Sequence, residues 1–155
     1  LLRMATEDIG NADPRALHIC LDAWQGYTRL GSPEGDLLLA QAVSYLACCA
    51  KSNAVYSAFK LAQQDTQKYG TLPVPMHLRN APTQLMKQSG YGAGYQYDHE
   101  VAGGIAYDQT GFPDKLDEQR YYQPTNNGLE QKIAEKLNYI RAQRMKKEQK
   151  TRKSS

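Results

Sequence analysis

The chain has 155 residues, 41% of them hydrophobic and 23% charged, with a formal net charge of +3 at pH 7. This length favours one globular domain. No stretch approaches the roughly 18 apolar residues of a membrane span, and no signal peptide is recognisable, so we expect a cytoplasmic protein without a membrane partner.

The chain opens on "LLRMATEDIG", without an initiator Met and with apolar residues in helical spacing. We therefore expect a fragment of a longer protein. Asp13 and Pro14 predict the start of a first long helix, and Gly31 predicts its end. The apolar residues of this helix recur on one face: Leu17, Cys20, Leu21 and Trp24.

Ser32 and Pro33 repeat the start signal. The helix that follows is apolar nearly all round from Leu37 to Ala50, which predicts the central, most buried element. The joints to its neighbours are short, which favours an antiparallel helical bundle. No alternating strand pattern is present, so the predicted fold class is all-α.

Ser52 predicts the cap of a third helix, which Gly70 closes. Its apolar side chains should pack against the bundle: Val55, Ala58, Phe59 and Ala62.

Residues 71–125 are different, because proline, glycine and tyrosine dominate them. The whole chain holds 11 Tyr against 2 Phe and 1 Trp. Only residues 81–89 look helical there, with Asn80 as the cap. The tyrosines and other apolar side chains of residues 71–125 argue against disorder. We expect this segment to be largely irregular but ordered, wrapping over the helical bundle within a single domain of residues 1–143.

A last amphipathic helix is predicted after Thr125 to Asn127, with a stripe of Leu129, Ile133, Leu137 and Ile140. Residues 144–155 hold six Lys or Arg against Glu148 alone, a charge of +5. We expect this basic segment to be a solvated, disordered tail.

No recognised catalytic motif is present. Gly90, Gly92 and Gly94 follow a helix and lack the spacing of a dinucleotide loop, and the chain contains no Gly-Lys pair for a Walker loop. No serine lies in a nucleophile elbow. The spacing of Cys20, Cys48 and Cys49 suits neither zinc nor a disulfide framework, and predicts small buried side chains in a reducing compartment. We expect no enzyme activity, cofactor or metal in this segment.

The densest group of candidate functional residues lies in "MHLRNAPTQLMKQSGYGAGYQY". As a nucleic-acid surface, its basic side chains would meet phosphates while its tyrosines stacked on bases. As structure, its glycines would let tyrosines pack tightly. Two basic residues make a weak electrostatic footprint, so the structural interpretation is favoured. The candidate interface or binding residues are His77, Arg79, Asn80, Lys87, Tyr91, Tyr95 and Tyr97.

Several long strings resemble the C-terminal region of the replication-associated recombination protein A family, also called MgsA or RarA, which is related to the eukaryotic Werner-helicase-interacting protein family. These strings are "TEDIGNADPRAL", "LGSPEGDLLLAQAVSYLA", "KSNAVYSAF", "LPVPMHLRNAPTQLMKQSGYGAGYQYDHE" and "RYYQPTNNGLEQKI". They occur in the family's order over residues 4–140.

The resemblance implies an AAA+ ATPase of the clamp-loader branch that acts in DNA replication, recombination and repair at stalled forks. Its helical C-terminal region would resemble the clamp-loader collar and join subunits into a homo-tetramer. ATP and Mg would bind the N-terminal part, and DNA and single-stranded-DNA-binding protein would be partners of the full-length protein. The alternative is a DNA- or partner-binding module that uses the basic tail and the Tyr-rich loop.

Overall fold

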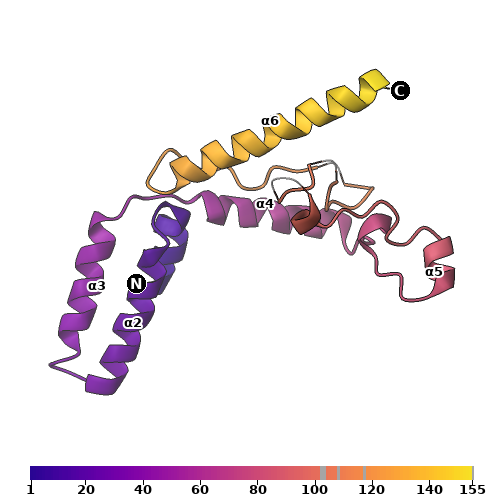
Figure 1. The fold of residues 1–155 in the computed structure, drawn as a ribbon. Coiled ribbons are helices and arrows are strands. Elements are labelled where there is room, and N and C mark those ends of the chain that lie inside the picture. The colour runs from indigo at the N-terminus through magenta and orange to yellow at the C-terminus, as the bar shows by residue number, and fades with distance from the viewer. Residues whose placement is uncertain (102–103, 108, 117, 155) are drawn as a thin grey trace. The chain divides into compact units, whose positions relative to one another are not determined.

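The computed structural model describes residues 1–101, 104–107, 109–116 and 118–154. These residues form helices joined by turns and irregular segments, and no strand occurs among them (Figure 1). The predicted all-α fold class is therefore confirmed. Among the helices that the structure describes, none is long and apolar enough to cross a lipid bilayer.

The chain divides into two compact units. Unit 1 comprises Leu1–Asp65 and Tyr121–Leu137, and unit 2 comprises Thr66–Arg120 and Asn138–Ser155. The expectation of a single helical domain over residues 1–143 stays a prediction.

Unit 1 begins with a short helical run of α1 (Leu2–Met4), the π-helical η1 (Ala5–Ile9) and the 3-10 turn η2 (Gly10–Ala12). Then follow α2 (Arg15–Leu30), α3 (Asp36–Cys48) and the start of α4 (Ala54–Tyr69). Unit 1 also holds the first turns of α6 (Glu130–Ser154).

Two predicted helix ends are confirmed. Gly31 follows α2 with φ +68°, and its N–H donates to the Tyr27 carbonyl at 2.8 Å. Gly70 follows α4 with φ +65°, and its N–H donates to the Thr66 carbonyl at 3.0 Å. Both are left-handed conformations that glycine adopts without steric cost.

The predicted start of α3 at Pro33 is wrong, because residues 32–35 form a turn and the helix begins at Asp36. The hydroxyl of Ser32 instead donates to the Asp36 carboxylate at 2.8 Å. Gly35 is buried in this turn, and its N–H donates to the Gly31 carbonyl at 2.6 Å. A side chain on Gly35 would clash with the Gly31 carbonyl and with Tyr27, so this tight turn requires glycine.

Helices α2 and α3 lie side by side as an antiparallel pair (Figure 1). The small core that they build with η1 is aliphatic and includes one thiol: Ala5, Ile9, Ala16, Cys20 and Leu46. Cys20 is thus the small buried side chain that we predicted. Cys49 is only half-buried and Cys48 is exposed, so the prediction is wrong for Cys48.

The prediction that α3 is the most buried element is wrong. Ala42 and Leu46 are buried on one side of this helix, whereas Leu37 is 74% exposed and Val43 is 50% exposed on the other. Periodicity locates apolar side chains, but burial needs a neighbouring element. Within the described part of unit 1, no element covers the outward side of α3.

The predicted packing of the α4 stripe is also wrong. In the residues described, α4 makes no extended contact with α2 or α3, and Phe59 is 61% exposed. The start of α4 agrees with prediction, since the Ala54 N–H donates to the Ser52 hydroxyl at 3.2 Å.

Unit 2 contains η3 (Met76–Leu78), α5 (Gln84–Gln88) and η4 (Asp98–Glu100), with irregular segments between them. The remainder of α6 belongs to it and runs to Ser154. Residues 144–154 thus continue a helix in the structure. That they fray in solution stays a prediction, since helices without tertiary packing are marginal in water.

Candidate functional site

The loop from His77 to Tyr97 is ordered by backbone hydrogen bonds within unit 2. The Gly92 N–H donates to the Met76 carbonyl at 2.9 Å, and the Tyr91 N–H donates to the Met86 carbonyl at 3.1 Å. Gly90, Gly92 and Gly94 all have positive φ, between +71° and +86°. The three glycines therefore make consecutive tight turns that return the chain onto residues 76–86.

The predicted cap of the short helix is wrong. Thr83, not Asn80, caps α5, because its hydroxyl accepts from the Met86 N–H at 3.3 Å. Asn80 is exposed and lies outside the helix. Both residue types cap helices well, so the sequence alone does not distinguish them.

Two of the predicted site residues are brought together. Arg79 donates from Nε to the Val74 carbonyl at 2.7 Å, and its guanidinium lies over the Tyr91 ring, 5.3 Å from the centroid. His77 Nε2 lies 3.0 Å from the Thr110 carbonyl oxygen, to which it donates. Through these contacts, Arg79 and His77 stabilise the conformation of the loop.

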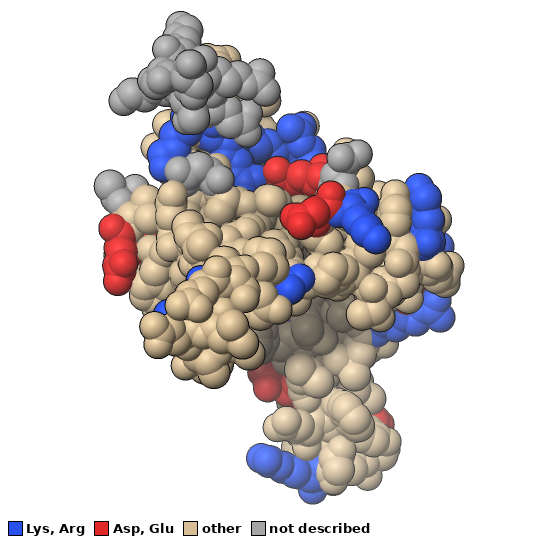
Figure 2. Space-filling view, turned by 90° about the vertical axis from the view of Figure 1, so that its right-hand side faces the viewer, with Lys and Arg blue, Asp and Glu red and all other residues tan. Residues whose placement is uncertain are grey.

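The remaining candidates are exposed. Lys87 is on the surface, and Tyr95 and Tyr97 are 50% and 51% exposed. Tyr97 pairs with the His99 ring at 5.0 Å, and η4 places Asp98 and Glu100 beside it. Figure 2 turns the α5 side of unit 2 towards the viewer and shows this face to be largely uncharged. A phosphate backbone would gain little there.

A buried carboxylate that the sequence analysis missed organises unit 1. Glu130 is fully buried at the first position of α6. Its Oε2 accepts from the Ser52 hydroxyl at 2.7 Å, the Thr125 N–H at 2.7 Å and the Thr125 hydroxyl at 2.8 Å. Its Oε1 accepts from the Tyr122 hydroxyl at 2.8 Å.

The environment of Glu130 keeps it ionised. Burial by itself would raise the pKa of this carboxyl, but the hydrogen bonds from Ser52, Thr125 and Tyr122 outweigh it and lower the pKa. All its contacts are donors that hold the anion, so Glu130 acts as a structural tie. A glutamate in a first helical turn normally suits the helix dipole at the surface, so no sequence pattern signals its burial.

The turn before Glu130 docks on the N-terminal helices. The Leu129 N–H donates to the Ala12 carbonyl at 2.9 Å, and Asn127 Nδ2 donates to the Lys51 carbonyl at 2.8 Å. Gly128 lies between them with φ +54°, where a Cβ would stand 2.1 Å from the Ala12 oxygen. Only glycine permits this close approach.

A second carboxylate, Asp13, fastens the start of α2. It receives two bonds from the Arg15 guanidinium, both at 2.8 Å, and one from the Tyr45 hydroxyl at 2.8 Å. The hydrogen bond from Arg15 is the main reason that the pKa of Asp13 falls to about 2, although burial opposes it.

Acid is expected to weaken unit 1 through Asp13. Because its pKa is lowered from 3.8 to about 2 in the folded state, its stabilisation is complete above 3.8 and is lost as the pH falls towards 2. The urea unfolding midpoint of Asp13→Asn should therefore fall less than that of the unmodified chain between about pH 5 and about pH 2.5. Glu34→Gln, at an exposed position, is the control. Parallel pH profiles for Asp13→Asn and the unmodified chain would contradict the role of Asp13.

Neither carboxylate cluster is arranged for catalysis. Glu130 is enclosed by its donors, and Asp13 is held by Arg15 and Tyr45. Within the described ranges, no group of three or more His, Cys, Asp or Glu side chains is placed to hold a metal ion.

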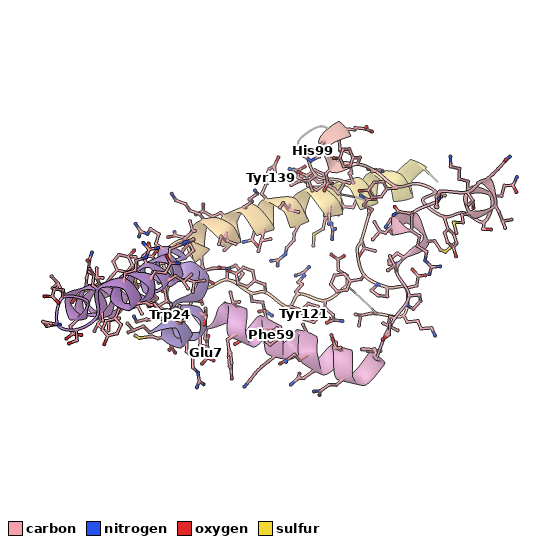
Figure 3. The ribbon with its side chains drawn as sticks, turned by 90° about the horizontal axis from the view of Figure 1, so that it is seen from below. Glu7, Trp24, Phe59, His99, Tyr121 and Tyr139 are labelled. Carbon is pink, nitrogen blue, oxygen red and sulfur yellow. The ribbon has the colours of Figure 1, made fainter. Side chains whose placement is uncertain are left out.

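The strongest candidate for an interaction site is instead the uncovered apolar surface of unit 1. On α2, Trp24 is 58% exposed and Leu30 is 59% exposed, and Leu21 and Trp24 border an open hollow of about 440 Å³. Figure 3 labels Trp24 on α2 and Phe59 on α4. An exposed apolar patch beside a hollow is typical of surfaces that bind other proteins.

Fold and site together define a helical domain that exposes apolar side chains on several of its helices. The sequence pattern of the family described as "MgsA AAA+ ATPase C terminal" matches residues 1–141. The chain therefore belongs to the family of MgsA AAA+ ATPase C-terminal domains, which confirms the resemblance seen in the sequence.

Curated relatives agree with this assignment. The chain is 56% identical over 141 residues to "Replication-associated recombination protein A" of Coxiella burnetii, and 51% identical over 142 residues to the protein of that name in Escherichia coli K12. These matches cover 91% and 92% of the chain but 32% of each relative. "ATPase WRNIP1" of Dictyostelium discoideum is 38% identical over 123 residues, 79% of the chain and 14% of that relative. The chain thus spans about a third of the length of its bacterial relatives.

Proposed function

We propose that this segment is the self-association domain of an AAA+ ATPase and joins its subunits into a tetramer. The observation that carries the proposal is the apolar surface left uncovered on α2, α3 and α4 of unit 1. Leu37, Phe59 and Trp24 are each more than half exposed. Burying such side chains contributes about 1.5–3 kcal/mol each, and a homo-oligomer is the commonest way to cover them.

The whole protein, in this proposal, acts in replication-associated recombination and repair of DNA. ATP and Mg would bind the part outside this segment, and DNA and single-stranded-DNA-binding protein would be partners of the full-length protein. The names of the bacterial relatives and the AAA+ description of the family support this. In this proposal the present segment assembles the subunits and catalyses no reaction. The two carboxylates, Glu130 and Asp13, are accordingly engaged in structural hydrogen bonds.

The mass of the 155-residue chain in solution tests the assembly role. Light scattering on the peak from a gel-filtration column should give about 70 kDa, four times the 17.4 kDa of one chain. High salt should leave this mass unchanged, because an apolar interface is not screened by ions. A mass of one chain at micromolar concentration would overturn the proposal.

A DNA- or partner-binding role for the same segment is the alternative. Exposed Lys146 and Lys147 on α6 favour it. Arg144 opposes it, because its guanidinium donates to the Gln109 carbonyl at 3.0 Å and pairs with Glu118. We expect the chain to show no saturable binding of a labelled single-stranded oligonucleotide at about 0.15 M salt in fluorescence anisotropy.

Saturable binding in that assay would favour the alternative. Its loss in a Lys146→Ala, Lys147→Ala variant would then locate the binding on the basic end of α6, whereas unchanged binding would exclude these two lysines.

A further inference from the structure

The outward side of α3 carries no charge from Leu37 to the end of the helix. Its central residues are Leu37, Ala40, Ser44 and Ala47, which are all exposed; we call them the α3 face. No Asp, Glu, Lys, Arg or His occurs anywhere from Leu37 to Ala50. Surface helices normally carry charged residues on the side away from the core, and α2 does so with Arg15, Asp22 and Arg29.

The one hydroxyl of the α3 face needs no water. Ser44 Oγ donates to the Ala40 carbonyl of the preceding turn at 2.9 Å. Its hydrogen is thus satisfied within the helix. A partner can cover Ser44 without leaving an unpaired donor, which would otherwise cost about 1–3 kcal/mol. The α3 face can therefore be dehydrated at little cost.

We propose that the α3 face binds the α3 face of a second copy of this chain, with the two helices antiparallel across a two-fold axis. This inference rests on the proposed self-association and says which surface makes one of its contacts. A charged partner surface would lose its hydration against a face that offers no ion pair. The α3 face of a second copy has this uncharged character along its whole length.

The sequence of side-chain sizes fits the antiparallel arrangement. When the axis passes at the level of Ala42, Leu37 of one copy lies opposite Ala47 of the other, and Ala40 lies opposite Ser44. Each large residue then meets a small one, and the small central pair lets the two helices approach closely. Because α-helices rise 1.5 Å per residue, the two Cys48 side chains would be separated by about 18 Å along the direction of the helices.

Introduced charge tests the inference on the 155-residue chain. Ser44→Glu should raise the dissociation constant of self-association at least about tenfold, because a carboxylate would be buried without a partner. Thr6→Glu is the matched control, on η1 and outside the apolar surfaces of α2, α3 and α4. Thr6 is also exposed, and its hydroxyl donates to the Arg3 carbonyl at 3.1 Å, as Ser44 does to Ala40. The control should assemble like the unmodified chain, and circular dichroism should show equal helix content in both variants.

Charge pairing tests the register. Ala40→Lys alone should also weaken association, whereas a mixture of Ala40→Lys and Ser44→Glu chains should recover the assembly, since positions 40 and 44 face each other across the axis. Under mild oxidation the exposed native Cys48 should form no disulfide between copies, because the distance is too large.

The outcomes distinguish failure of the proposed self-association from failure of the proposed α3 contact. If the unmodified chain is a monomer, the proposed function and this inference both fail. If it is a multimer and Ser44→Glu assembles as well as Thr6→Glu does, assembly stands and the α3 face is excluded. Efficient crosslinking of Cys48 between copies, or no recovery in the mixture, would exclude the antiparallel register.

Discussion

Replacing Glu130 by alanine is expected to lower the free energy of unfolding of unit 1 by roughly 3–5 kcal/mol. The carboxylate accepts from four donors on Ser52, Tyr122 and Thr125, and it is fully buried. Alanine would leave those donors buried without acceptors, and each unsatisfied polar group costs about 1–3 kcal/mol. A domain of this size has only about 5–15 kcal/mol of total stability.

Urea unfolding followed by circular dichroism measures the effect. Glu130→Gln should cost less than alanine, because the amide oxygen can occupy the place of Oε2 and keep its three bonds. Glu135→Gln is the control, on the exposed side of the same helix, and it should change the unfolding free energy by less than about 0.5 kcal/mol. If Glu130→Ala unfolds at the same urea concentration as that control, the carboxylate does not tie the unit together.

Replacing Gly128 by alanine is the second change with a large expected effect, a loss of about 3 kcal/mol or more. The added Cβ would lie 2.1 Å from the Ala12 oxygen and 2.9 Å from its carbonyl carbon, and both atoms belong to the backbone. Relief would require the turn to move away from η2, which would break the bond from the Leu129 N–H to the Ala12 carbonyl. The unfavourable φ of +54° adds to this cost.

Gly70→Ala separates the clash from the backbone conformation. Gly70 has φ +65°, and nothing lies within 4 Å of an added Cβ, so only the conformational cost of about 1–2 kcal/mol should remain. Thermal unfolding of both variants should therefore show a distinctly lower midpoint for Gly128→Ala. Equal midpoints would mean that the close approach to Ala12 is unimportant.

Some features of the candidate surface could be predicted from sequence, and others could not. The turns at Gly90, Gly92 and Gly94 follow from glycine's freedom at positive φ, and the order of the loop follows from its tyrosines. The contact between Arg79 and Tyr91 could not be foreseen, because it depends on the path of the chain through residues 80–90. Whether His77, Lys87, Tyr95 and Tyr97 contact a partner stays a prediction.

By itself, the sequence determined the helical class, the helix ends at Gly31 and Gly70, and membership of the family through long ordered strings. Each of these three features follows from a local rule or from a direct match of residues. None of them depends on which residues lie close together in the folded chain. Of the predicted apolar face of α2, Cys20 lies in the core, whereas Leu17 and Trp24 are exposed.

Only the tertiary structure decided which apolar surfaces are covered and where a charge is buried. The bond from Ser52 to Glu130 joins residues 78 positions apart, and the approach of Gly128 to Ala12 spans more than a hundred. No local pattern encodes such pairs. Burial depends on which residues surround a side chain in the folded protein. The all-round apolar sequence of α3 therefore predicted a central helix, but the outward side of α3 is exposed in the single chain. We propose that a second copy covers it.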